Sequence, residues 1–247
     1  MGEQAARRVA FVTGAGSGIG RATAHAFIKA GYAVAFVDRD GAAAAREAAA
    51  AGDGAIAVTC DVTDDGAVRA AVDATVAAFG RLDAAFNAAG IDGAAAPLAD
   101  ATMENWNRVL AIDLTGMFSC MRYQIPAMLA SGGGAIVNCA STAGITGAPH
   151  LTAYCAAKHG VVGLTRGAAL DYARQNVRVN AVCPGMIDTP MAASIPPEFL
   201  KALLAESPMG RQGKPEEIAA AVLWLCDPSS SFVTGQAIPV DGAWTTR

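Results

Sequence analysis

A glycine-rich turn between an apolar run and a helix-like run constrains the fold of this chain more than any other feature. The apolar residues 9–12 lead directly into residues 13–20, which have glycine at 14, 16, 18 and 20, and residues 21–30 are typical of a helix. In this order of strand, turn and helix, glycines let the backbone approach a pyrophosphate, and the unpaired N–H groups and dipole of the helix start favour its negative charge. The sequence therefore predicts a dinucleotide-binding unit. Its predicted contacts are Gly14, Ser17, Gly18, Ile19 and Gly20.

A second apolar run, residues 33–37, ends at Asp38, eighteen positions after Gly20. This is about where a carboxylate is needed to bind the adenosine ribose hydroxyls. A carboxylate there also repels a 2′-phosphate, so Asp38 favours NAD over NADP. Arg39 keeps NADP open as the less favoured cofactor, since a guanidinium can accommodate that phosphate.

Helix-like and strand-like stretches then alternate, with helices expected over 42–51 and 64–79 and strands over 56–60 and 82–86. Such alternation implies parallel βαβ units and a three-layer, doubly wound α/β fold of the Rossmann type, with helices on both faces of the sheet. The dinucleotide then lies across the carboxyl ends of the strands. The further contacts expected there are Asp61, Val62, Asn87, Ala88 and Gly90.

The second half continues the pattern with a long helix-like segment over 102–129, a strand before Ser141, and further strands over 177–182 and 236–240. Between the last two lies a proline- and glycine-rich stretch whose apolar residues, Phe199, Leu200, Leu203 and Leu204, have the spacing of a short amphipathic helix. We expect one domain over 1–247, with this stretch as a substrate flap over about 186–212.

An acid–base pair is predicted by Tyr154 and Lys158, which are four positions apart in the helix-like run 152–172 and so share one helix face. Bringing a tyrosine from a pKa of about 10 to near 7 requires roughly 4 kcal/mol of preference for the phenolate. A cation about 4 Å away supplies about 4 kcal/mol at an effective dielectric constant near 20. Ser141, thirteen positions before Tyr154, is expected at a strand end that faces this helix, where its hydroxyl can hold a substrate oxygen.

Charge and cysteine content exclude several classes of partner. The net charge is −4 and no Lys/Arg-rich run occurs, which argues against nucleic-acid and anionic-membrane partners. The six cysteines form no C-x-x-C pair, so we expect buried thiols, no metal and no disulfide. No apolar segment precedes residue 9 and no run approaches the ~20 residues of a membrane span, so a cytoplasmic protein without a signal peptide is expected.

Taken together, these motifs make the chain resemble the short-chain dehydrogenase/reductase family over essentially its whole length. The motifs are Thr13-Gly14-x3-Gly18-Ile19-Gly20, Asn87-Ala88-Ala89-Gly90, Ser141, Tyr154-x3-Lys158, and Pro184-Gly185 followed by Thr189. The resemblance implies a mostly parallel sheet of seven strands and a homo-oligomer, most simply a homotetramer. It also implies that Ser141, Tyr154 and Lys158 are catalytic, that Tyr154 and Lys158 contact the cofactor, and that Lys158 binds the nicotinamide ribose. Further cofactor contacts implied near the nicotinamide are Pro184, Gly185, Ile187 and Thr189.

Asp113 departs from the family pattern, because the resemblance places an asparagine here as the fourth catalytic residue. Its family role is to hold a water that relays protons to the lysine. Aspartate keeps the shape and the acceptor oxygens but loses the amide donor and can add a charge. We therefore retain Asp113 as a catalytic candidate with an altered proton relay.

The predicted substrate contacts indicate a secondary alcohol or ketone. They are Ser141, Asp92, Ala143, His150, Tyr154 and Met186. Because neither arginine nor lysine is among them, an uncharged, alicyclic or steroid-like substrate of small or medium size is expected. Two alternatives stay open: an NADPH-dependent 3-oxoacyl reductase acting on an acyl carrier, and a non-catalytic dinucleotide-binding protein.

Overall fold

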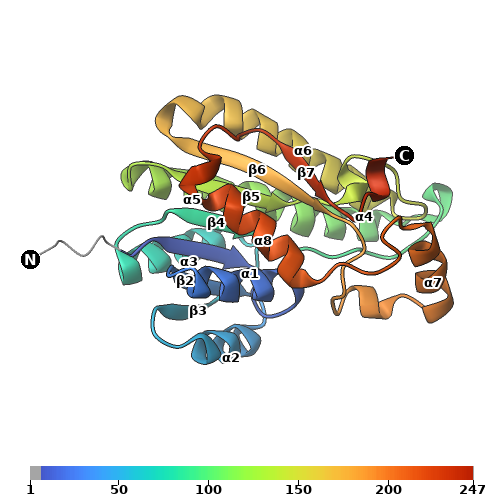
Figure 1. The fold of residues 1–247 in the computed structure, drawn as a ribbon, viewed down its shortest axis with the longest axis horizontal. Helices are drawn as coiled ribbons and strands as arrows, with labels where there is room; N and C mark the ends of the chain where they lie inside the picture. Colours follow the sequence, from blue (N-terminus) through green and yellow to red (C-terminus); the bar gives the residue numbers. More distant parts are fainter. Residues whose placement is uncertain (1–6, 247) are drawn as a thin grey trace, which may run out of the picture.

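A seven-stranded, wholly parallel sheet forms the centre of the protein in a computed structural model that describes residues 7–246 (Figure 1). The order across the sheet is β3-β2-β1-β4-β5-β6-β7. The strands are β1 (Val9–Thr13), β2 (Ala33–Asp38), β3 (Ala55–Thr59), β4 (Ala84–Asn87), β5 (Gly134–Cys139), β6 (Val177–Pro184) and β7 (Ala237–Val240). The predicted doubly wound α/β fold is confirmed, since the strand order reverses between β1 and β4.

Helices cover both faces of the sheet, as a parallel sheet requires. They are α1 (Gly18–Lys29), α2 (Gly41–Ala51), α3 (Asp65–Phe79), α4 (Met103–Leu110), α5 (Gly116–Ala130), α6 (Thr152–Tyr172), α7 (Pro197–Glu206) and α8 (Pro215–Cys226). The core beside α1, α2 and α8 is one apolar cluster, and the core beside α3, α5 and α6 is another. Successive β1 residues alternate between them, with Phe11 in the second cluster and Val12 in the first.

The long helix predicted over 102–129 is wrong as a single element. The structure divides it into α4, a π-helical turn over Ala111–Thr115, and α5. The turn carries Asp113, whose side chain is fully buried. Gly116 begins α5 against Val62, and an added Cβ would lie only 2.8 Å from a methyl group of Val62. Close packing is therefore the reason for this glycine.

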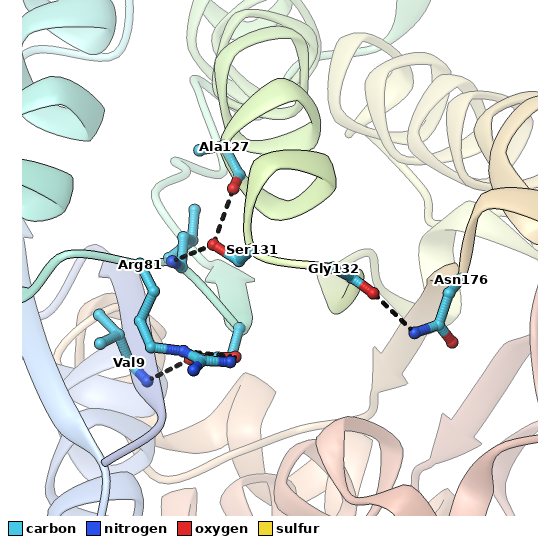
Figure 2. A network of polar contacts seen from close by, with 8 residues as sticks. Val9, Arg81, Ala127, Ser131, Gly132 and Asn176 are labelled. Carbon is cyan, nitrogen blue, oxygen red and sulfur yellow. Dashed lines mark hydrogen bonds and ion pairs between the residues drawn. The ribbon is translucent and has the colours of Figure 1, made fainter. Parts of the chain in front are cut away.

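Polar side chains stabilise the amino edge of the sheet, where the strands begin (Figure 2). The Asp83 carboxylate accepts a hydrogen bond from the Val9 backbone N–H (2.8 Å) and pairs with Arg81. Nearby, the Ser131 hydroxyl accepts from the Leu82 N–H at 3.0 Å and donates to the Ala127 carbonyl. These contacts leave the opposite, carboxyl edge for the functional site.

The predicted flap leaves the sheet after β6 and returns at Gly213. Ile187 and Gly213 form a parallel bridge, and the Gly213 N–H donates to the Met186 carbonyl at 2.9 Å. Between these ends, α7 lies beyond the carboxyl edge of the sheet, at the right of Figure 1. The two ends of the flap are thus held against each other.

Within residues 7–246, no helix is long and apolar enough to cross a membrane. The expectation about a signal peptide rests partly on residues 1–6, which lie outside the described residues.

Candidate active site

A cavity of about 580 Å³ opens at the carboxyl edge of the sheet. It extends from the glycine turn after β1, past the ends of β4 and β5, to the flap. Most residues predicted from the sequence line it together: Gly14, Ser17, Gly18, Ile19, Gly20, Asp38, Arg39, Asp61, Val62, Ala88, Gly90, Asp92, Asp113, Ser141, Ala143, Tyr154, Lys158, Pro184, Gly185, Met186, Ile187 and Thr189.

The side chain of Asn87 lies elsewhere. It is buried, and its amide donates to Gln124 and to Asn138, both at 3.0 Å. Asn138 in turn donates to Thr165 on α6. The Asn87 side chain therefore belongs to a buried polar network behind the cavity and does not line the cavity, while the predicted cofactor contact of this residue stays a prediction.

His150 is also outside the main cavity. Its backbone has φ +64°, and the residue is exposed at a small neighbouring recess of about 20 Å³. The left-handed backbone turns the chain just before α6 begins. Phe199 on α7 is 64% exposed and does not line the cavity, whereas Leu203 does.

Some residues that line the cavity were not predicted from the sequence. Residues 146–149 between β5 and α6, Ile195 in the flap and Trp244 after β7 all line the cavity. Trp244 could have been predicted, because it follows the last strand and so lies at the same edge of the sheet. The others lie in loops whose path depends on tertiary packing.

The glycine turn fits a dinucleotide pyrophosphate. Gly18 has φ +53° at the start of α1, and an added Cβ would face the Thr189 methyl at 3.4 Å. A Cβ on Gly20 would collide with the carbonyl oxygen of Gly14. Both glycines keep the backbone open towards the cavity, where the first N–H groups of α1 are available to an anion.

Asp38, at the end of β2, lines the cavity next to the glycine turn. Its carboxylate accepts hydrogen bonds from the Gly16 and Asp40 N–H groups, both at 2.9 Å. The neighbouring Arg39 is exposed. The carboxylate is therefore fixed where a ribose would approach the cavity, while the exposed Arg39 guanidinium acts electrostatically on the Asp61 carboxylate.

Tyr154, Lys158 and Ser141 come together at the middle of the cavity. α6 places the Lys158 Nζ 5.4 Å from the centre of the Tyr154 ring, as the four-residue spacing predicts. The Lys158 Nζ donates to the Cys139 carbonyl at 3.0 Å, which ties α6 to the end of β5. Ser141 follows β5 directly and its hydroxyl accepts from the Ala143 N–H at 3.1 Å.

Asp113 completes this cluster from the π-helical turn. Its Oδ1 accepts from the Ile91 N–H at 2.9 Å, and its Oδ2 lies 3.2 Å from the Lys158 Nζ. Both side chains are almost completely buried, with 4% of Lys158 and 0% of Asp113 exposed. The Oδ2 has the distance of an ion pair but not the alignment of a hydrogen bond, so it keeps an unused acceptor position.

The electrostatics differ from the sequence argument. Burial raises the pKa of Tyr154 to about 12, although Lys158 and a hydrogen bond with Ser141 act to lower it. Burial would lower the pKa of Lys158, but the Asp113 carboxylate and Tyr154 outweigh it, so that pKa is raised. The four-residue spacing predicts only the effect of the Lys158 cation, whereas burial and the opposing charge of Asp113 also act on Tyr154.

Comparison with known proteins defines the family. A family model described as Enoyl-(Acyl carrier protein) reductase matches residues 14–245. Cis-4-hydroxycyclohexanecarboxylate dehydrogenase of Sinomonas cyclohexanicum is 45% identical over 247 residues, which cover 99% of either chain. Cyclohexanol dehydrogenase of Acinetobacter sp. (strain SE19) is 44% identical over 97% of this chain and 96% of its own. The chain belongs to the short-chain dehydrogenase/reductase family and is an oxidoreductase that acts on CH–OH groups.

Solved structures support the same conclusion. Levodione reductase has a TM-score of 0.93 at 36% identity, covering 97% of this chain and 98% of its own. A 3-ketoacyl-(acyl-carrier-protein) reductase from Brucella melitensis, complexed with NADH, has a TM-score of 0.92 at 36% identity over 96% and 98% of the two chains. An actinorhodin polyketide ketoreductase with NADPH has a TM-score of 0.93 at 37% identity over 100% of both chains. The family binds a nicotinamide dinucleotide in either its NAD or its NADP form.

Proposed function

We propose that this protein catalyses the NAD-dependent interconversion of an uncharged alicyclic secondary alcohol and its ketone. The observation that carries the proposal is that Tyr154, Lys158 and Ser141 line the same cavity as the glycine turn after β1. A non-catalytic dinucleotide-binding protein needs the glycine turn but not a tyrosine–lysine pair in the same cavity. The arrangement therefore favours catalysis.

In the proposed reaction, the Tyr154 phenolate takes the proton of the alcohol, and the Ser141 hydroxyl holds the same oxygen as its charge changes. When bound, an oxidised nicotinamide supplies the hydride acceptor and a second positive charge. Lys158 stabilises the phenolate and orients the ribose of the cofactor. Since the pKa of Tyr154 is about 12 in the protein alone, alcohol oxidation is expected to accelerate as the pH rises.

NAD is the proposed cofactor because of Asp38. Its carboxylate is fixed by two backbone N–H groups and repels a 2′-phosphate, while no hydrogen bond or ion pair with another described residue holds the Arg39 side chain over that position. The glycine turn serves both dinucleotides equally. The choice between them therefore depends on residues 38 and 39.

The substrate is proposed from the lining of the cavity beyond Tyr154. Met186, Met191 and Leu203 from the flap and Ile91 and Leu151 from the opposite side are apolar, and all line the cavity. The names of the two relatives describe six-membered alicyclic alcohols as their substrates, cyclohexanol for one and a ring alcohol that also carries a carboxylate for the other. A cyclohexanol-sized ring fits this chemistry.

We also propose a cytoplasmic homotetramer. Large apolar side chains are exposed on three helices, with Phe118 on α5 at 49%, Leu170 on α6 at 85% and Trp224 on α8 at 46%. Exposed side chains of this size on several helices favour contacts between copies of the chain.

A substrate panel tests the proposed activity. The purified protein is incubated with NAD or NADP and with cyclohexanol, a linear secondary alcohol, a sugar, a hydroxysteroid or a 3-hydroxyacyl thioester, and reduced nicotinamide is followed by absorbance. Cyclohexanol with NAD is expected to give the highest kcat/KM. A best substrate that is carrier-linked, with NADPH preferred in the reverse direction, would establish the 3-oxoacyl reductase alternative, and absence of turnover with every substrate would establish the non-catalytic one.

A further inference from the structure

Among the described residues that line the cavity, Asp92 is the one carboxylate at its substrate end that the proposed reaction does not use. It follows β4 by five residues, is partly buried, and lines both the main cavity and the small recess beside it. Tyr154 and Leu151 line the same two spaces. Asp92 is therefore beside the tyrosine to which the reacting hydroxyl is assigned.

The carboxylate of Asp92 has no hydrogen bond or ion pair with another described residue, unlike Asp38 and Asp113. Lys158 is the nearest cation on the cavity wall, but it already contacts Asp113 at 3.2 Å and the Cys139 carbonyl at 3.0 Å. Burial and the Asp113 charge raise the pKa of Asp92, and Lys158 acts in the opposite direction. Asp92 therefore presents to the cavity a half-buried acceptor without a protein donor, and a ligand hydroxyl can donate a charge-assisted hydrogen bond to it.

The surrounding charges also determine which ligands are excluded. The charged or titratable side chains near Asp92 are Asp113 on the π-helical turn, Lys158 and Tyr154 on α6, and the exposed His150, which lines the same small recess. Arg39, the other cation of the cavity lining, belongs to the opposite end beside Asp38. Asp92 would therefore repel a carboxylate on the substrate, whereas a hydroxyl would donate a charge-assisted hydrogen bond to it.

We propose that Asp92 is a specificity-determining residue that accepts a hydrogen bond from a second hydroxyl group on the substrate ring. This inference rests on the proposed oxidation of alicyclic alcohols and adds to it a preferred substrate class. Alicyclic diols are better substrates than the corresponding mono-alcohols, and ring alcohols that carry a carboxylate are poor substrates.

Steady-state kinetics with matched substrates test this inference. The substrates are cyclohexanol, cis- and trans-1,4-cyclohexanediol, and cis-4-hydroxycyclohexanecarboxylate, each at saturating NAD. The enzymes are the parent, Asp92→Asn, Asp92→Ala and the control Asp100→Asn, which removes one negative charge at an exposed position that lines neither space. Thermal unfolding and NAD binding of each variant show whether it is folded and binds the cofactor.

For the parent, kcat/KM of the better diol isomer is expected to exceed that of cyclohexanol by about tenfold or more. This factor corresponds to the usual contribution of one hydrogen bond to a charged group. Asp92→Ala should remove this advantage, so that the ratio of kcat/KM for the diol to kcat/KM for cyclohexanol falls to about one, and in both Asp92 variants the ratio for the carboxylate over cyclohexanol should rise. Asp100→Asn should change none of these ratios.

An unchanged ratio of diol to cyclohexanol in folded Asp92→Ala and Asp92→Asn would overturn the role of Asp92 while leaving the proposed activity intact. Absence of turnover of all four substrates by the parent would overturn the proposed activity itself, and the inference with it.

Discussion

Replacing Asp113 by asparagine tests how the buried ion pair controls the acid–base group. The substitution keeps the shape of the side chain and its acceptor to the Ile91 N–H, but removes one negative charge from the cluster. Lys158 then acts on Tyr154 without the opposing charge of Asp113. We expect the pKa of Tyr154 to fall and the pH profile of alcohol oxidation to move towards acid.

The size of the shift follows from two distances. The Lys158 Nζ is 3.2 Å from the Asp113 Oδ2 and 5.4 Å from the centre of the Tyr154 ring, so the carboxylate is at most about 9 Å from that ring. At an effective dielectric constant near 20, its charge destabilises the phenolate by about 2 kcal/mol, which corresponds to about 1.4 pKa units. A shift of about 1 to 1.5 units is therefore expected.

The assay is kcat/KM for cyclohexanol oxidation between about pH 6 and pH 11 at saturating NAD, a ratio that reports groups of the enzyme before the alcohol binds. The phenolate is the reactive form, so the rate rises with pH up to the pKa of Tyr154 and is constant above it. Asp113→Asn should reach its plateau at lower pH and exceed the parent near pH 7. Its plateau should be lower, because a base of lower pKa accepts a proton less readily.

An unchanged pH profile would refute the reasoning, as would a shift towards alkali. The second result would mean that Lys158, buried and without its partner, had lost its proton. Asp61→Asn is a useful comparison, because it removes a carboxylate from the far, cofactor end of the same cavity and should leave the position of the profile unchanged.

Four further outcomes are expected. Tyr154→Phe should bind NAD like the parent but lower kcat by about a thousandfold, because it removes only the proton-transfer group; activity above a few per cent would assign proton transfer to another residue. Asp38→Ala should lower the NAD/NADP ratio of kcat/KM by roughly tenfold, and a parent that already prefers NADP would show that Arg39 decides. Asp83→Ala should lower stability by about 2 kcal/mol in urea unfolding with unchanged kcat/KM at 25 °C, since its contacts are at the edge of the sheet away from the cavity; a loss of activity without loss of stability would contradict this. Sedimentation at micromolar concentration should show a tetramer that Phe118→Ser and Leu170→Ser weaken, and a parent of 25 kDa only would refute it.

The sheet and the central cluster could be predicted because local patterns determine them. Apolar runs bounded by glycine and aspartate indicated each strand, and the spacing of Tyr154 and Lys158 in a helix without proline put both on one face. The predicted NAD cradle followed from one strand–turn–helix sequence. All of these depend on residues close together in the chain.

Features that depend on contacts between distant segments could not be predicted. The π-helical turn has no distinctive sequence signal, and it is stabilised where Gly116 meets Val62 and Asp113 meets Lys158. The direction of the Asn87 side chain depends on Gln124, 37 positions away. The high pKa of Tyr154 also needed the burial of the whole cluster, which no spacing of residues reveals.

The bridge between Ile187 and Gly213 makes the flap a closed loop with a fixed base. Because the ends are already joined, lengthening the segment between them adds little loop entropy, about 0.6 kcal/mol for each doubling. Insertions or replacements over 190–210 can therefore change the flap residues that line the cavity without displacing β6 or α6. For protein engineering, this segment can be exchanged as a unit. Transplanting the corresponding loop of another family member between residues 187 and 213 should transfer substrate preference, while the cofactor preference, which we propose depends on residues 38 and 39, should stay that of the host.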